Sequence, residues 1–364
     1  MRLAHASAAL IGVSTLLALP AAFAAERVQV VTSFSILADM VENVGGEHVE
    51  VTSLVGPDSD AHVYSPRPTD ARALAEADLV VFNGLQFEGW MERLIDSSDY
   101  AGPLVVTTTG IDRVAAAHDD HGHDEHDDHG HDEHDDHGHD DHGHEGHDHE
   151  GHDHGHEGHD HGHEGHDHGD DDPHGWQDLA MGKVYVANIR DGLIEADPDN
   201  AEAYTANAQR YINEIDATDA EIRELLGEIP ASTSVITGHD SFGYFASAYG
   251  LRFLSPQGLS TEAEPSAANM ARLIDVIREQ NVQALFHENM TSPAIITQLA
   301  EETDLPIAGT LYADALAAEG EASTYLGMMR HNARTLHDAL AEPGHDDQGH
   351  DEDDHDDHGH GHSH

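Results

Sequence analysis

The chain has 364 residues, with 15 lysines and arginines against 72 aspartates and glutamates, and its formal net charge is −57. A protein that binds nucleic acid needs a basic surface to displace the counterions of phosphates, so we expect no nucleic-acid partner. Cysteine is absent, which excludes disulfides.

Residues 1–25 are typical of a secretory signal peptide. Arg2 provides a positive start, residues 8–19 are apolar, and Ala22 and Ala24 are the small side chains of a cleavage site. The apolar run is too short to cross a bilayer, and no later run approaches the ~20 apolar residues that a span needs. Because no cysteine is present to carry a lipid, we expect a periplasmic protein without lipid anchor or membrane insertion.

Strand and helix patterns alternate along both halves of the remaining chain. Helical patterns occupy 36–44, 71–77 and 268–280, and β-rich runs occur at 28–34, 49–55, 79–83, 104–109, 235–237, 251–254, 284–287 and 307–311. This alternation predicts an α/β fold with two lobes, each built on a mainly parallel four-stranded sheet. We expect the N-terminal lobe to comprise 26–117 plus 173–198, and the C-terminal lobe to comprise 229–343.

A helix-rich stretch separates the two lobes. From residue 200 to 226 apolar side chains recur at helical spacing with no glycine or proline, and Pro198 suits the first turn of a new helix. We therefore expect residues 199–228 to form one rigid linking helix. Two ordinary helices within one lobe are the alternative.

Two tracts contain histidine and acidic residues but no apolar side chain. Residues 118–172 hold 21 histidines and 23 acidic residues, and the tail 344–364 holds 7 and 8. Such segments have nothing to bury, so we expect them to be disordered without metal. Imidazoles and carboxylates at this density indicate weak, poorly selective metal capture, and a tolerated expansion without a role is the alternative.

Four side chains outside the tracts are candidate metal ligands. His62 and Asp314 follow the strands at 49–55 and 307–311, His239 directly follows the strand at 235–237, and His174 lies where the acidic tract ends. Ligand sites in open α/β sheets lie beyond the carboxyl ends of strands. Three imidazoles and one carboxylate, two from each lobe, would make a four-coordinate zinc site in the interlobe cleft, and loop histidines that are simply solvated are the alternative.

Several motifs occur in the order found in one receptor family. They are Ala61-His62-Val63-Tyr64 with Pro66, Asp172-Pro173-His174-Gly175-Trp176, the segment 238–245 that begins Gly238-His239-Asp240, Glu264-Pro265-Ser266 and Leu311-Tyr312-Ala313-Asp314. The chain thereby resembles the metal-binding solute receptors of bacterial ABC importers, the ZnuA-like group, and the segment 260–265 is most similar to its AztC branch. The resemblance covers the mature chain apart from the tracts.

The resemblance implies two α/β lobes joined by a long helix and capture of Zn²⁺ for delivery to an inner-membrane ABC permease. It implies the ligands His62, His174, His239 and Asp314, a monomeric receptor, and a periplasmic zinc chaperone as a further candidate partner. Manganese-binding relatives have Glu where this chain has His239. Replacing a hard carboxylate by imidazole favours zinc over manganese.

Other residues and functions remain open at the sequence level. His287 and Glu288 end a strand and are candidates to face the cleft, and Asp240 is a candidate either to orient His239 or to serve at the surface. His48 is expected at the surface, and His331 and His337 are expected to face solvent or to lie at the edge of the core. The rival functions are a zinc hydrolase, for which we find no His-Glu-x-x-His pattern, and a periplasmic metal buffer that meets no transporter. We expect no enzyme.

Overall fold

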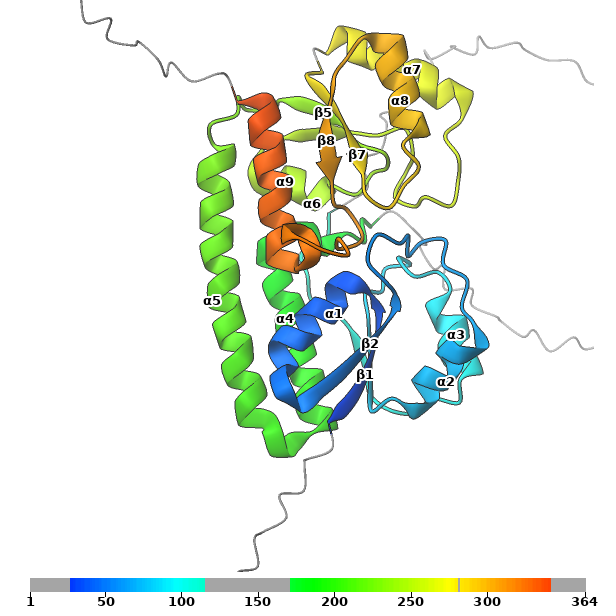
Figure 1. The fold of residues 1–364 in the computed structure, drawn as a ribbon, viewed down its shortest axis with the longest axis vertical. Coiled ribbons are helices and arrows are strands. Elements are labelled where there is room, and N and C mark those ends of the chain that lie inside the picture. Colours follow the sequence, from blue (N-terminus) through cyan, green and yellow to red (C-terminus); the bar gives the residue numbers. More distant parts are fainter. Residues whose placement is uncertain (1–26, 115–170, 281, 342–364) are drawn as a thin grey trace, which may run out of the picture.

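The computed structural model describes residues 27–114, 171–280 and 282–341. These residues form two lobes stacked one above the other, with long helices along one side (Figure 1). The predicted signal peptide, the tail 344–364 and nearly all of the tract 118–172 lie outside the described residues.

The N-terminal lobe is built on a parallel sheet with strand order β2-β1-β3-β4. Its strands are β1 (Val28–Phe34), β2 (Val49–Val55), β3 (Leu79–Phe82) and β4 (Leu104–Val106). Helices α1 (Ser35–Gly45) and α4 (Leu179–Ala196) lie on one side of this sheet, and α2 (Pro68–Glu76) and α3 (Met91–Ser97) lie on the other (Figure 1).

The C-terminal lobe repeats this plan with strand order β6-β5-β7-β8, again parallel. Its strands are β5 (Ser234–Ile236), β6 (Arg252–Leu254), β7 (Ala284–Glu288) and β8 (Ile307–Leu311), and its helices are α6 (Gly243–Tyr249), α7 (Ala267–Glu279), α8 (Ala294–Thr303) and α9 (Tyr325–Leu340). Short 3-10 turns η1 to η4 occupy Gly46–His48, Gly175–Gln177, Pro198–Asn200 and Glu321–Ser323. The predicted α/β fold with two four-stranded parallel sheets is confirmed.

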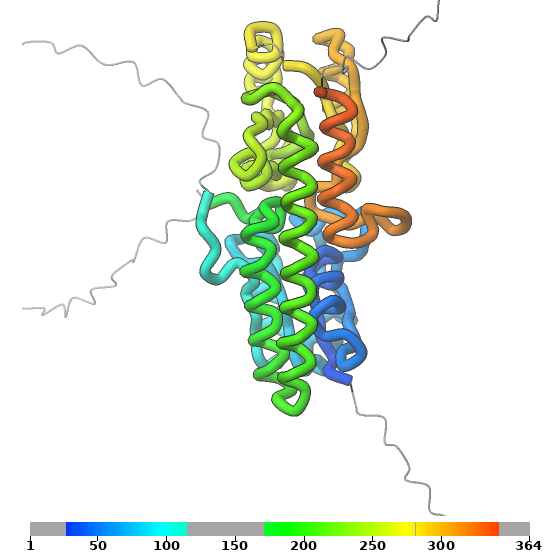
Figure 2. Tube along the Cα trace, turned by 90° about the vertical axis from the view of Figure 1, so that its left-hand side faces the viewer, coloured from blue at the N-terminus to red at the C-terminus, as the bar shows by residue number. Residues whose placement is uncertain are grey.

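One continuous helix, α5 (Ala201–Leu226), follows the turn at Pro198 and runs beside both lobes (Figures 1 and 2). Its buried face includes Tyr204, Tyr211 and Ile222. These side chains belong to a core cluster that also contains residues of both sheets, so α5 packs against the two lobes as a strut. The alternative of two separate helices is wrong.

A second apolar cluster belongs to the C-terminal lobe alone. It lies between the outer face of the sheet and α7 and α8, and its members include Ile236, Leu285 and Leu299. Within the described ranges, no helix combines the length and apolar character that crossing a membrane requires.

Two sequence expectations need correction. The predicted strand 104–109 ends at Val106, because the N–H of Thr109 donates to the carbonyl of Val106 and closes a turn. The predicted tract 118–172 extends too far, because Asp172 is buried and its N–H donates to the carbonyl of Val114 over 2.9 Å. Asp172 therefore belongs to the N-terminal lobe and not to the tract.

Candidate metal centre

The structure brings all four candidate ligands to one buried point between the lobes. One ligand atom from each of His62, His174, His239 and Asp314 lies within 4.8 Å of the others. Parallel sheets place the carboxyl ends of their strands at one edge, and the two sheets turn these edges toward each other. Loops after β2, β5 and β8 therefore reach the same point, and His174 joins them from the turn before α4.

The carboxylate of Asp314 lies among the three imidazoles. Its Oδ2 is 3.3 Å from Nε2 of His62 and 3.0 Å from Nε2 of His239, and its Oδ1 is 3.6 Å from Nε2 of His174. The imidazole rings meet nearly edge to face, with centroids 5.4 to 5.7 Å apart. All three Nε2 atoms thus point toward the same small space.

These converging atoms lack satisfactory hydrogen bonds. Among the described residues, the three Nε2 atoms and both carboxylate oxygens of Asp314 are buried and meet no hydrogen-bond criterion. The Nε2 atoms of His62 and His239 are nevertheless close enough to Oδ2 of Asp314 for an ion pair. Buried polar atoms without partners are costly, and such groups call for an ion or water that satisfies them. Three nitrogen donors and one oxygen donor match a tetrahedral N3O cation site.

Carboxylates orient two of the imidazoles by contacting Nδ1, the ring nitrogen that faces away from the site. Oδ1 of Asp172 lies 2.7 Å from Nδ1 of His174 and also accepts the His174 N–H over 2.9 Å. Oε2 of Glu288 lies 2.6 Å from Nδ1 of His239, while its Oε1 accepts the backbone N–H groups of Gly238 and His239. An ionised carboxylate only accepts, so each of these two Nδ1 atoms carries hydrogen, and Nε2 is the ring atom left to bind a cation once it is deprotonated.

The sequence predicted some of these neighbouring residues and not others. Glu288 faces the site as one expectation allowed, whereas His287 precedes it on β7 and projects to the opposite face of the sheet. Asp172 was counted in the tract as well as in a family motif, and its role beside His174 was not predicted. The signal that identifies it is its place two residues before His174, with only Pro173 between.

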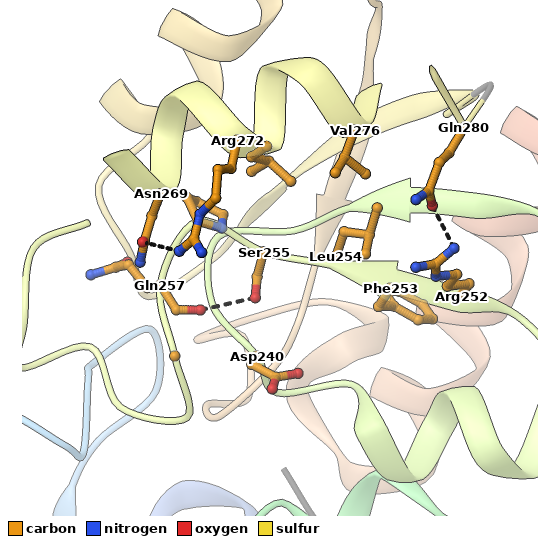
Figure 3. Close-up of a pocket in the computed structure, with 13 residues that line it drawn as sticks. Asp240, Arg252, Phe253, Leu254, Ser255, Gln257, Asn269, Arg272, Val276 and Gln280 are labelled. Carbon is orange, nitrogen blue, oxygen red and sulfur yellow. Dashed lines mark hydrogen bonds between the residues drawn. The ribbon is translucent and has the colours of Figure 1, made fainter. Parts of the chain in front are cut away.

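Asp240 does not orient His239. Its side chain lines a separate cavity of about 460 Å³ between β6 and α7 (Figure 3). The expectation that Asp240 accepts the free ring N–H of His239 is wrong, because Glu288 occupies that position. His331 is half-buried beside the carbonyl of Thr310, as expected for the edge of the core. His48, expected at the surface, is instead half-buried, with its ring packed against Tyr204.

The charges of the site shift two pKa values in opposite directions. Burial alone raises the pKa of Asp314, but the imidazoles of His239 and His174 outweigh it and hold that pKa well below its ordinary value. Burial alone lowers the pKa of His239, but the carboxylates of Glu288 and Asp314 outweigh it and hold that pKa well above its ordinary value. The metal-free site is therefore an ion pair of imidazolium and carboxylate.

Hydrogen bonds tie the loop of Asp314 to the other lobe. The indole Nε1 of Trp176 and the amide Nε2 of Gln177 both donate to the carbonyl of Ala313, each over 2.9 Å. The hydroxyl of Tyr325 in turn donates to the carbonyl of Trp176 over 2.6 Å. These bonds fix the position of Asp314 relative to His174.

An aromatic side chain packs against the candidate ligands, all of which are buried. Phe87 lies against His62 with ring centroids 4.6 Å apart and against Trp176 at 4.9 Å. His174 and His239 are fully buried, and His62 is 4% exposed. The resulting low dielectric strengthens the attraction between these ligand atoms and a cation.

Comparisons with known proteins agree with this geometry. A family model described as "ZnuA: Zinc-uptake complex component A periplasmic" matches residues 30–339. The chain is 29% identical over 319 residues to the manganese-binding lipoprotein MntA of Halalkalibacterium halodurans, covering 87% of this chain and 90% of that protein. It is 28% identical over 314 residues to the iron-binding protein YfeA of Yersinia pestis, covering 86% of each.

A solved structure shows the same fold. The periplasmic zinc binding protein TroA of Treponema pallidum superimposes with a TM-score of 0.70 and 26% sequence identity, covering 87% of this chain and 100% of that chain. The similar proteins thus carry names that refer to zinc, manganese and iron, and the fold alone does not choose among these metals.

Proposed function

This chain belongs to the ZnuA family of periplasmic metal-uptake components, and from that premise we propose that it captures Zn²⁺ between its lobes and delivers it to a membrane ABC permease. Members of this family are solute receptors and not enzymes. The ion is the transported cargo. We propose His62, His174, His239 and Asp314 as its ligands.

The observation that carries the proposal is the convergence of three Nε2 atoms and one carboxylate in a buried space. A tetrahedral zinc site with bonds near 2.0–2.1 Å has ligand atoms about 3.3 Å apart. The separations from Asp314 to the three imidazoles are 3.3, 3.0 and 3.6 Å. The first two distances are to Oδ2 and the third is to Oδ1, and one ligand atom from each of the four residues lies within 4.8 Å of the others. This spacing supports a small four-coordinate ion if the ligands draw closer on binding.

The donor types support zinc over the other metals in the names of its relatives. Manganese prefers carboxylate, carbonyl and water oxygens, whereas imidazole suits zinc. Three of the four donors here are imidazoles, and the Nδ1 atoms of two of them lie against the carboxylates of Asp172 and Glu288, an arrangement typical of metal-bound histidines. We therefore assign zinc as the preferred cargo.

We further propose that the mature receptor begins after the signal sequence 1–25 and carries no lipid. Curated relatives such as MntA are named lipoproteins, but this chain has no cysteine to which a lipid can be attached by a thioether.

We propose that the receptor is a monomer, and a periplasmic zinc chaperone is a further candidate partner. Growth of a deletion strain at low zinc, rescued by the intact receptor, separates uptake from simple metal buffering.

A competition titration tests the metal assignment. The protein lacking residues 118–168 and the tail is titrated with Zn²⁺ and Mn²⁺ against chelators of known strength, and scattering at the zinc edge locates the ion. We expect one ion per chain among the four proposed ligands and a clear preference for zinc. Equal or tighter binding of manganese contradicts the zinc assignment, and an ion elsewhere contradicts the ligand assignment.

The same titration on a designed double variant checks the physical reason. His239→Glu alone places a second carboxylate against Glu288, so Glu288→Gln is added to remove the repulsion. We expect this pair of changes to shift preference from zinc toward manganese. An unchanged preference shows that His239 does not decide the selectivity.

A further inference from the structure

Basic side chains are scarce, and most of those that the structure describes are neutralised within it. Eight form ion pairs: Arg113–Asp171, Lys183–Asp216, Arg190–Asp191, Arg210–Glu214, Arg223–Asp219, Arg278–Asp275, Arg330–Glu221 and Arg334–Glu321. Arg67, Arg72 and Arg93 are exposed and form no ion pair with any described residue. All three lie in or beside α2 and α3.

Two of these arginines line one pocket. The α2–α3 pocket has a volume of about 320 Å³, and no carboxylate lines it; its lining residues are Pro66, Arg67, Pro68, Ala71, Trp90, Arg93, Leu94 and Ser97. The nearby carboxylate of Asp70 is already engaged, because its Oδ2 accepts the hydroxyl of Tyr64 and the N–H of Arg67. The guanidinium groups are thus available to an anionic partner.

The larger cavity between β6 and α7 differs in this respect. Its two arginines have neighbours within the cavity wall, since Arg252 donates to Gln280 and Arg272 donates to Asn269 over 2.6 Å (Figure 3). A carboxylate, that of Asp240, also lines it. This cavity therefore offers less uncompensated positive charge than the α2–α3 pocket.

The α2–α3 pocket shares a wall with the loop that carries His62. The indole of Trp90 lines the pocket and donates its Nε1–H to the carbonyl of Ala61 over 2.8 Å, and its ring packs against Tyr64 at 5.1 Å. Between these contacts lies Val63, whose exposed fraction of 52% is high for a large apolar side chain. A partner seated in the pocket thus contacts the loop of a proposed ligand.

The position of this surface on the molecule also suits a partner. Helices α2 and α3 lie on the side of the molecule opposite the long helix α5 (Figure 1). Proline, leucine and tryptophan side chains form the pocket wall, and guanidinium groups bind carboxylates in a bidentate manner. The matching occupant is a carboxylate that is flanked by apolar side chains.

We propose that the α2–α3 pocket, together with Val63, is the surface on which the membrane permease docks, through an acidic and partly apolar periplasmic segment. This inference rests on the proposed function, because it names where that permease binds. A protein segment fits better than an anionic lipid, since a lipid headgroup needs the charges but not the apolar wall. Docking here places the permease against the loop from which it receives the ion.

Binding of the zinc-loaded full chain to permease in nanodiscs of neutral lipid tests this proposal. The variant Arg67→Glu/Arg93→Glu reverses both charges in the pocket without touching a proposed zinc ligand. We expect its affinity for the permease to fall about tenfold or more, while its zinc stoichiometry and affinity stay unchanged. Arg210→Glu, an exposed position on α5, is the matched control and should bind the permease normally.

The outcomes separate the docking surface from the proposed function. If the original chain binds the permease and the double variant binds equally well, the docking surface is wrong and the receptor function stands. If the original chain does not bind any zinc permease, both fail together. Tight, arginine-dependent binding to empty nanodiscs with anionic lipid, without preference for the permease, identifies a membrane-surface site and overturns the proposal. A lower affinity of the Arg210 control also overturns it, because general charge is then responsible.

Discussion

Glu288, at the end of β7, accepts a 2.6 Å hydrogen bond from Nδ1 of His239, which follows the neighbouring strand β5. The same carboxylate accepts the N–H groups of Gly238 and His239 with its other oxygen. It thereby fixes both the backbone and the ring of His239. A single side chain thus sets the direction in which Nε2 points.

The first prediction concerns this carboxylate. Glu288→Gln retains the size of the side chain but removes its charge, so the His239 ring becomes a weaker donor to metal. We expect zinc affinity to fall about 10- to 100-fold with a native fold, measured by chelator competition. Asp240→Asn, beside His239 but directed into the other cavity, is the control and should bind zinc normally. Equal affinities for the two variants contradict the role of Glu288.

The second prediction concerns a proposed ligand. His62→Ala removes one of three imidazole donors, and in protein lacking residues 118–168 we expect the tight stoichiometric zinc site to disappear, a larger effect than that of an outer carboxylate. The fold should persist, because His62 lies in a loop. His48→Ala, which changes a ring packed on Tyr204, should leave the site intact. Tight binding that survives His62→Ala removes this residue from the ligand set.

The third prediction concerns proton release. The raised pKa of His239 means that this imidazole is protonated in the metal-free protein at neutral pH, whereas zinc needs it neutral. We expect close to one proton released per zinc at pH 7, measured calorimetrically in buffers of different ionisation enthalpy. Zinc affinity should rise with pH above 6.5, the ordinary His value. Binding without proton release contradicts the imidazolium of the metal-free state.

The same two pKa shifts determine how the stability of the metal-free protein changes with pH. The raised pKa of His239 contributes stability that is fully present below 6.5 and is lost as pH rises through the folded pKa. The lowered pKa of Asp314 contributes stability that is present above 3.8 and is lost as pH falls through the folded pKa. Thermal unfolding should therefore show that the stabilisation added by zinc grows from pH 6.5 upward.

The fourth prediction concerns the contact between lobes. Trp176→Phe keeps an aromatic ring but removes the hydrogen bond to the carbonyl of Ala313, which Gln177 also contacts. We expect a loss of about 1 kcal/mol in the free energy of unfolding and weaker zinc binding, because Asp314 is held less firmly. The double variant Trp176→Phe/Gln177→Leu should lose more zinc affinity than the single one. Unchanged zinc affinity in both variants refutes this positioning role.

The fifth prediction concerns the histidine-rich tract, which lies outside the described residues. Deleting 118–168 should lower the number of weakly bound zinc ions and slow the loading of dilute zinc, since a tethered metal-binding segment raises the local concentration of the ion. The affinity of the tight site should stay the same. Stopped-flow loading at submicromolar zinc tests this, and equal rates with and without the tract remove the capture role.

The sequence by itself determined the fold, and together with the motifs of a receptor family it predicted the four candidate ligands. Regular alternation of β-rich runs and helical patterns fixes parallel strands, and the runs at 28–34, 49–55 and 307–311 coincide with β1, β2 and β8. Because side chains after such strands meet at one edge, His62, His239 and Asp314 were expected together before any distance was known. Local pattern suffices here because hydrophobic periodicity is a property of neighbouring residues.

Only the tertiary structure decided which carboxylate orients which imidazole. Asp240 and Glu288 are equally acidic in sequence, and the nearer one to His239 along the chain is not its partner. Asp172 resembles the acidic residues of the tract in sequence, and only its burial shows that it belongs to the N-terminal lobe. The partner of each imidazole depends on which strands are adjacent and on which face of the sheet a side chain lies. Packing across the sheet determines these two properties, and separation along the chain does not.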